Sequence, residues 1–109
     1  MNYSYRLEKS TITKDEMVLH APKLTPQGYE TQASALATAL RGRWSRELRC
    51  WFFTPGRAKK WVLLHDAGFW PDDKSSELRF INPRLGKKRS FRLPEAVIIA
   101  KLLPAKGTP

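Results

Sequence analysis

Apolar and polar positions alternate at the beginning of the chain with the period of two that is typical of β-strands. Residues 3–9 (YSYRLEK) show this alternation, and residues 17–20 (MVLH) follow a polar turn as a second strand. Further along, the apolar positions change to the spacing of one helix face, at Tyr29, Ala33, Leu36, Ala37 and Leu40. The pattern therefore predicts a ββα unit over residues 3–42.

Capping residues set the expected limits of this first helix. The pair Thr25–Pro26 is a helix-start signal, because threonine caps a helix and proline suits a position whose N–H has no partner. Gly28 near the first turn leaves open a later start of regular helix, as late as Glu30. Gly42 is expected to end the helix, and residues 21–24 are an expected linker.

The middle of the chain repeats this order with many aromatic residues. Residues 43–45 (RWS) and 50–53 (CWFF) are predicted strands, because aromatic side chains suit a half-buried pleated surface. The charged residues 46–49 between them form the expected hairpin turn. Thr54–Pro55 then begins a helix that Gly68 ends in a left-handed conformation.

A third group of elements follows a loop. Residues 77–81 and 88–92 are predicted strands on either side of a turn at residues 82–86. A last helix over residues 93–103 is followed by a tail at residues 104–109.

The three units, residues 3–42, 43–68 and 77–103, fit one α+β domain over residues 1–109. We expect a small antiparallel sheet with helices packed on one face, in the order ββα-ββα-ββα. The last two units each have a proline and a glycine at the same separation. This spacing leaves open whether the units are true repeats.

Charge is distributed unevenly along the chain. The formal net charge is +10, and residues 1–40 contribute none of it, because they carry four basic and four acidic groups. Residues 41–109 carry sixteen basic and six acidic groups. Such asymmetry favours a polyanionic partner, most often nucleic acid, over a merely solvated surface.

Composition indicates a soluble cytoplasmic protein. Hydrophobic residues make up 41% of the chain and charged residues 28%, which is ordinary for globular proteins. The sequence has no apolar run of membrane-spanning length and no basic-then-apolar leader, so we expect no membrane association. The single cysteine, Cys50, excludes an internal disulfide and is expected to be a small buried strand residue.

Basic residues and tryptophans coincide around the predicted hairpin. Cations neutralise phosphates and flat rings stack on unpaired bases, so this composition is typical of surfaces for single-stranded nucleic acid. The alternative is that both tryptophans belong to the core, and we expect one to be buried and one partly exposed. The candidate binding residues are Arg41, Arg43, Trp44, Arg46, Arg49, Trp51, Arg57, Lys59 and Lys60.

A second group of cations surrounds the predicted turn at residues 82–86. Residues 79–92 contain six basic residues and no acidic one. A basic hairpin tip can follow a phosphate backbone or enter a groove, although a solvated loop has a similar composition. The candidates here are Arg79, Arg84, Lys87, Lys88, Arg89 and Arg92.

The sequence gives little support for catalysis or metal binding. His20 and His65 are isolated and lack the spacing of metal ligands. Residues 71–79 (PDDKSSELR) resemble a PD…ExK nuclease motif, but the spacing is too short and Arg79 occupies the lysine position. We therefore expect no enzymatic activity, no catalytic residue, no metal and no cofactor.

The aromatic hairpin also carries a resemblance to known proteins. Residues 42–44 (GRW), a charged turn, residues 51–53 (WFF), a proline and a basic helix follow one another. This order resembles a "GRW…GW-hydrophobic-P" module of phage and plasmid accessory proteins and, more loosely, the HARP domain of annealing helicases. The resemblance covers residues 40–68 and departs from the pattern at Cys50, where the pattern has glycine. It implies contact with branched or single-stranded DNA.

Together these features predict a non-enzymatic protein that binds nucleic acid, with single-stranded or branched DNA favoured over RNA and over sequence-specific duplex. The alternative is an accessory factor of a phage, plasmid or integron that docks an acidic protein through the same basic face. The sequence predicts neither the sequence preference nor the oligomeric state.

Overall fold

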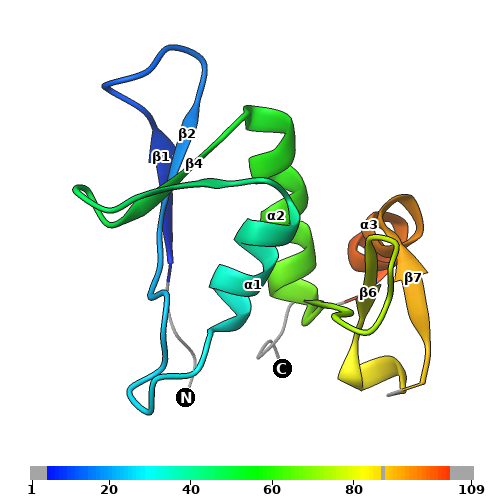
Figure 1. Cartoon of the computed structure of the whole chain (residues 1–109). Helices are drawn as coiled ribbons and strands as arrows, with labels where there is room; N and C mark the ends of the chain where they lie inside the picture. The colour runs from blue at the N-terminus through cyan, green and yellow to red at the C-terminus, as the bar shows by residue number, and fades with distance from the viewer. Residues whose placement is uncertain (1–4, 87, 104–109) are drawn as a thin grey trace.

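Two antiparallel sheets and three α-helices make up residues 5–86 and 88–103, the part of the chain that this computed structural model describes (Figure 1). The predicted α+β class is confirmed. In chain order the elements are β1 (Arg6–Lys9), β2 (Met17–His20), α1 (Gln32–Ala39), β3 (Arg43–Ser45), β4 (Cys50–Phe53), α2 (Pro55–Ala67), β5 (Trp70–Pro71), β6 (Arg79–Ile81), the 3-10 helix η1 (Pro83–Leu85), β7 (Ser90–Arg92) and α3 (Leu93–Leu102).

The first four strands form one sheet in the order β1-β2-β4-β3. The two expected ββα units are therefore joined, because β2 pairs with β4 and places Leu19 opposite Trp51. Each hairpin also pairs internally, with Leu7 opposite Leu19 and Trp44 opposite Trp51. Leu7, Leu19, Trp44 and Trp51 thus lie on one face of the sheet, the face that α1 and α2 cover.

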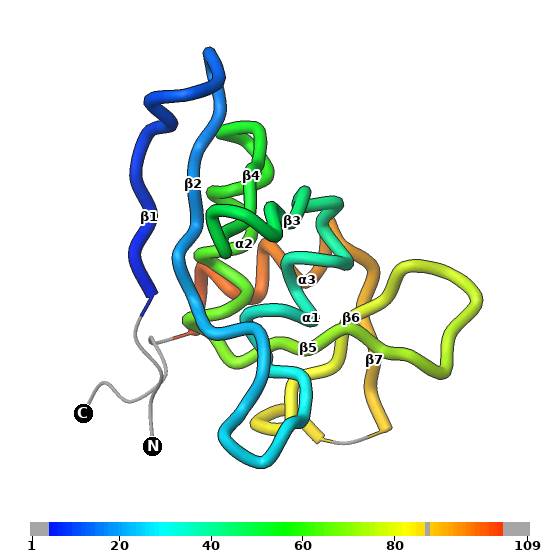
Figure 2. Tube along the Cα trace, turned by 60° about the vertical axis from the view of Figure 1, so that its left-hand side comes forward, coloured from blue at the N-terminus to red at the C-terminus, as the bar shows by residue number. Residues whose placement is uncertain are grey.

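The expectation of a single sheet is wrong, because the last strands form a separate sheet in the order β5-β6-β7. Its first strand, β5, is the short segment Trp70–Pro71 that directly follows the end of α2. A two-residue strand that contains proline leaves no alternating pattern to detect. The ββα order consequently holds for the first two units, whereas the third has an additional strand. Figure 2 shows β1 and β2 at one side of the molecule and β5 to β7 at the other.

One hydrophobic core extends from the first sheet to the second. Its fully buried aromatic residues are Trp51, Phe53, Trp61, Phe69 and Phe80. Trp61 lies at the centre, 0% exposed, where its indole N–H donates a 3.1 Å hydrogen bond from α2 to the Ala33 carbonyl of α1. Tryptophan thus supplies apolar contact area and also satisfies its one polar group.

The start of α1 differs from the prediction. The N-cap is Thr31, whose hydroxyl accepts from the Ser34 N–H at 3.1 Å. Thr25 instead closes a turn, because its hydroxyl accepts from the Tyr29 N–H. Tyr29 therefore lies outside the helix and is 73% exposed, contrary to its predicted place on the apolar face. The rest of that predicted face is buried, at Ala33, Leu36, Ala37 and Leu40.

The left-handed residue at the end of α1 is Arg41, whereas Gly42 was expected to end the helix. Arg41 takes the left-handed conformation, with φ 62°, and the Gly42 N–H donates back to the Ala37 carbonyl at 2.7 Å. This is the bonding pattern that ends many helices, but glycine commonly occupies the left-handed position. Gly42 is needed for space, because a Cβ there would lie 2.6 Å from Cζ of the buried Phe53 ring.

The limits of α2 agree with the prediction. Thr54 caps the first turn by accepting from the Arg57 N–H, and Pro55 occupies the first helical position. Gly68 ends the helix with φ 93°. The buried Asn82 side chain then donates to the Ala67 carbonyl at 2.9 Å, which ties the end of α2 to the second sheet.

Tyr5 connects the beginning of β1 to α2. Its hydroxyl donates to both carboxylate oxygens of Asp66, each at 3.1 Å, and its ring packs edge-on against Trp61. Burial, together with the Asp66 charge and hydrogen bond, raises the pKa of Tyr5 to about 12. The phenol therefore remains a hydrogen-bond donor throughout the physiological pH range.

The opposite face of the first sheet holds a smaller buried cluster. Val18, Cys50 and Phe52 form it, and the Arg43 guanidinium lies 4.7 Å from the Phe52 ring centroid. Burial raises the pKa of the Cys50 thiol, which is 1% exposed. Cys50 is thus a small buried strand residue, as expected.

Truncation of Trp61 should strongly destabilise the protein. We expect Trp61→Ala to lower the free energy of unfolding by about 3–5 kcal/mol, the usual cost of removing a buried aromatic side chain. Urea unfolding monitored by circular dichroism measures this change. An unfolding midpoint equal to that of the wild type would contradict the central position of Trp61.

Two glycine substitutions should have opposite effects. Gly42→Ala places a methyl group against the Phe53 ring and should destabilise the protein by about 1–3 kcal/mol, as overpacking does. Gly56→Ala is the matched control, because a Cβ at this helical position meets nothing within 4 Å. The control should raise the unfolding temperature slightly, since alanine favours a helix more than glycine does. Equal melting temperatures for the two variants would refute the packing role of Gly42.

Candidate nucleic-acid interface

A cleft of about 640 Å³ lies between the β3–β4 hairpin and the connection from β2 to α1. Figure 1 shows the hairpin tip and this connection on the same side of the molecule. The volume is within the range of about 300–1,000 Å³ that is typical of small-ligand sites. The residues that line the cleft are Ala21, Pro22, Lys23, Leu24, Trp44, Arg46 and Arg49.

The hairpin wall of the cleft is built around Ser45. The Arg49 N–H donates to the Ser45 carbonyl at 2.8 Å, and the Leu48 N–H donates to the Ser45 hydroxyl at 3.2 Å. The turn closes only because Arg49 adopts a left-handed conformation, with φ 54°. These bonds fix the backbone from which Arg46 and Arg49 extend along the cleft.

The opposite wall is held by the N-cap of α1. The Thr31 hydroxyl donates to the Pro22 carbonyl at 2.7 Å, and the Thr31 N–H donates to the Lys23 carbonyl at 3.2 Å. An isolated β-bridge between Leu24 and Glu30 continues this contact. The segment expected to be a linker is therefore a fixed wall, and it brings Lys23 and Leu24 into the cleft.

Trp44 gives the cleft its aromatic surface. Trp51 is buried, at 1% exposed, whereas Trp44 on the edge strand is partly exposed, which confirms the expectation of one buried and one partly exposed tryptophan. The two ring centroids are 4.4 Å apart, so Trp51 supports Trp44 from within the core. The Lys23 ammonium lies 5.0 Å from the Trp44 ring centroid.

The electrostatic character of the cleft is uniformly positive. Its described lining includes three cations, Lys23, Arg46 and Arg49, and no acidic side chain. Within residues 5–86 and 88–103, no carboxylate pairs with any of these three cations. Unpaired cations beside a supported aromatic ring can contact phosphates and a base at the same time.

Other cations of the predicted surface lie away from the cleft. Arg43 is on the opposite face of the sheet from Trp44, where it stacks on Phe52 and pairs with Glu16 at 3.2 Å. Arg41 ends α1, outside the cleft lining. The basic residues of α2 are exposed on its first turns, and they are Arg57, Lys59 and Lys60.

Much of the second predicted cluster is engaged within the protein. Arg79 donates to the Ser90 hydroxyl and carbonyl, Arg84 donates to the Ala67 carbonyl, and Arg92 pairs with Glu77. These three guanidinium groups stabilise the second sheet and the end of α2. Two members, Lys88 and Arg89, are exposed, and Lys87 lies outside the described residues.

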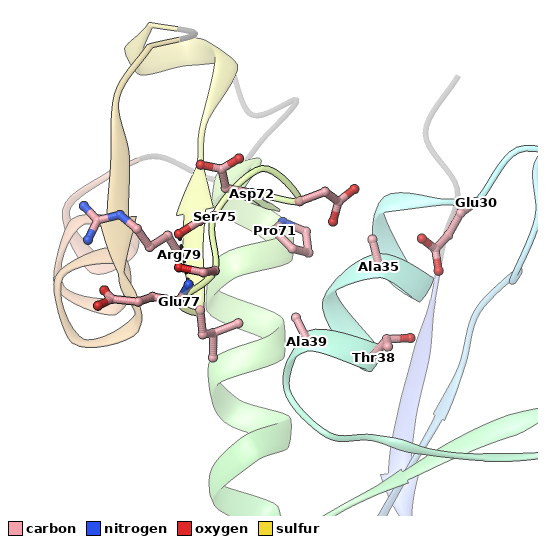
Figure 3. A pocket seen from close by; sticks show the side chains of 12 residues that line it. Glu30, Ala35, Thr38, Ala39, Pro71, Asp72, Ser75, Glu77 and Arg79 are labelled. Carbon is pink, nitrogen blue, oxygen red and sulfur yellow. Dashed lines mark hydrogen bonds between the residues drawn. The ribbon is translucent and has the colours of Figure 1, made fainter.

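A second cleft, of about 420 Å³, lies between α1 and the β5–β6 connection (Figure 3). It brings together the acidic residues that resemble a nuclease motif, and these are Asp72, Asp73 and Glu77, with Glu30 and Arg79. However, no three His, Cys, Asp or Glu residues in the described part of the chain are arranged to hold a metal ion.

The contribution of Lys23 and Leu24 was not detectable in the sequence. These residues precede the basic part of the chain, and they reach the hairpin only because β2 pairs with β4. Non-local strand pairing of this kind leaves no signal in local spacing.

Comparisons of the chain with protein-family models, curated proteins and solved structures found no match. The resemblance of residues 40–68 to phage and plasmid accessory proteins therefore stays a prediction. In the described residues, no helix is long and apolar enough to cross a membrane.

Replacing Arg49 by glycine should increase the stability of the folded protein, because Arg49 has a left-handed backbone conformation. Arg49→Gly relieves the left-handed conformation and should raise the free energy of unfolding by up to about 1 kcal/mol. Arg49→Ala is the control, because it removes the cation but keeps a Cβ in the same conformation. Thermal unfolding should therefore rank the glycine variant above both the alanine variant and the wild type. A glycine variant less stable than the wild type would contradict backbone strain at this position.

Proposed function

We propose that this protein is a non-enzymatic binder of single-stranded nucleic acid, and that the cleft between the β3–β4 hairpin and residues 21–24 is its binding site. The observation that carries the proposal is the exposed part of Trp44 among three cations, with no acid in the described cleft lining. Cations contact phosphates in any nucleic acid, but a ring can stack only on a base that is not already paired. The site therefore favours single strands, or the unpaired segments of branched ones.

The backbone of the cleft supports a role for its arginine side chains. Arg49 occupies a left-handed position where glycine would be more favourable. Strained conformations persist where the surrounding structure enforces them, and they are frequent at functional sites. In the folded protein that side chain has no acidic partner among the described residues, which leaves phosphate as a suitable ligand.

The exposed cations outside the cleft extend the proposed surface. Lys88 and Arg89 are exposed just before β7, and three more cations are exposed on α2. A strand held at the cleft has a positive field around it, which increases the association rate and makes binding depend on salt. The expected preference for DNA over RNA, and a cytoplasmic location, remain part of the proposal.

Binding to an acidic protein is the alternative, since it would use the same cations. Both modes of binding weaken as salt increases, so salt dependence alone does not separate them. Stacking on Trp44 separates the two modes, because an acidic protein surface presents no unpaired bases. A single strand that competes no better than an inorganic polyphosphate of equal charge would favour the alternative.

Fluorescence polarisation with labelled single-stranded, duplex and forked DNA, and with RNA, tests the proposal. We expect single strands to bind more tightly than duplex of the same length. Each neutralised phosphate of a single strand contributes about −0.7 to the slope of log affinity against log salt, so about six contacts give a slope near −4. Absence of binding at ~50 mM salt would end the proposal.

Matched arginine variants locate the site. Arg46→Gln removes a cation of the cleft and should weaken single-strand binding and reduce the salt slope by about 0.7. Arg57→Gln is the control, because Arg57 is exposed on α2 and does not line the cleft. We expect a clearly smaller loss of affinity for the control. Equal losses would indicate diffuse attraction to a basic surface without a localised site.

A further inference from the structure

Lys23 lies over the Trp44 ring, in the place that a stacked base would need. Its ammonium nitrogen is 5.0 Å from the ring centroid, and both residues line the cleft. Trp51 packs against Trp44 from the core, with the ring centroids 4.4 Å apart. Trp44 therefore contacts the core through Trp51, and the cation that lies over its ring belongs to the cleft lining.

The main chain of Lys23 is fixed, whereas its side chain can move. The Lys23 carbonyl accepts from the Thr31 N–H, and the neighbouring Pro22 carbonyl accepts from the Thr31 hydroxyl. The side chain itself is exposed and pairs with no carboxylate of the described residues. A lysine ammonium on its flexible stem can thus leave the ring without disturbing the wall of the cleft.

We propose that the cleft takes one unstacked base of a single strand and that this base displaces the Lys23 ammonium from the Trp44 ring. Lys23 then contacts an adjacent phosphate, together with Arg46 and Arg49 at the other wall. This inference rests on the proposed function and adds two features to it, a site for one base and a competition for the Trp44 ring.

The competition has a definite direction. Stacking of a base on an aromatic ring strengthens binding by about 5- to 150-fold. An exposed cation over a tryptophan ring contributes a smaller factor, about two- to fivefold. The base therefore wins, but Lys23 reduces the net gain from stacking. Its presence also keeps the ring covered when no strand is bound.

Two strands of equal charge separate stacking from phosphate contact. One is an oligothymidine of about eight nucleotides, and the other has the same backbone with an abasic site at every position. For the wild-type protein we expect the oligothymidine to bind about 5- to 150-fold more tightly than the abasic strand. Trp44→Leu should bring this ratio close to one while leaving affinity for the abasic strand nearly unchanged.

Lys23→Met tests the displacement itself. With the abasic strand, the Lys23 ammonium stays over the free Trp44 ring and contacts the adjacent phosphate from there, so its loss should weaken binding of this strand and reduce the salt slope by about 0.7. The ratio between the two strands should nevertheless rise about two- to fivefold, because the base no longer competes for the ring. Lys60→Met is the matched control, since Lys60 is an exposed lysine of α2 outside the cleft, and it should leave the ratio unchanged.

The possible failures are distinguishable. Salt-dependent binding with a wild-type ratio of one would overturn the base site and leave the proposed function as charge-driven binding. A ratio that falls or stays constant in Lys23→Met would overturn the displacement. No binding of either strand at ~50 mM salt would overturn the proposed function as well. Circular dichroism verifies folding of each variant, and if Trp44→Leu does not fold, the Lys23→Met ratio decides, because Lys23 is exposed.

Discussion

The pairing of β2 with β4 is the constraint on which the rest of the structure depends. It places Leu19 opposite Trp51 and so joins two local hairpins into one sheet with an apolar face for α1 and α2. A shift of one residue would turn these side chains to the other face. The same pairing sends the chain after His20 past the tip of the β3–β4 hairpin, which creates the cleft. Core and candidate site therefore follow from one register.

Local signals in the sequence predicted most of the elements but not their assembly. Thr54, Pro55 and Gly68 define α2 through short-range capping chemistry, and the structure reproduces these limits. In contrast, the sequence placed the start of α1 too early, because the Thr25–Pro26 signal belongs to a turn that precedes the true cap, Thr31. The second sheet was missed since β5 is too short to have a period.

The candidate site shows the same division between local and non-local information. Composition identified Trp44, Arg46 and Arg49 as neighbours on one hairpin, and the structure brings them to one cleft. Composition could not show that Arg43 lies on the other face of the sheet or that Arg79 bonds Ser90. Whether a cation is available depends on its partner, and the partner is set by tertiary structure. The net charge of +10 therefore does not show which cations are available to a ligand.

Two arginines that end turns carry backbone strain. Arg41 and Arg49 both adopt left-handed backbone conformations, where glycine would relieve strain. Arg49 lines the cleft, but Arg41 does not, so a common backbone cost accompanies different positions relative to the site. If backbone strain is retained because the side chain binds a ligand, we expect this at Arg49, whose turn fixes one wall of the cleft. At Arg41 the left-handed conformation closes the turn that ends α1. The next residue, Gly42, must remain small because it packs against the Phe53 ring. The strained backbone at Arg49 thus belongs to the turn that forms one wall of the cleft, whereas the strained backbone at Arg41 lies outside the cleft lining.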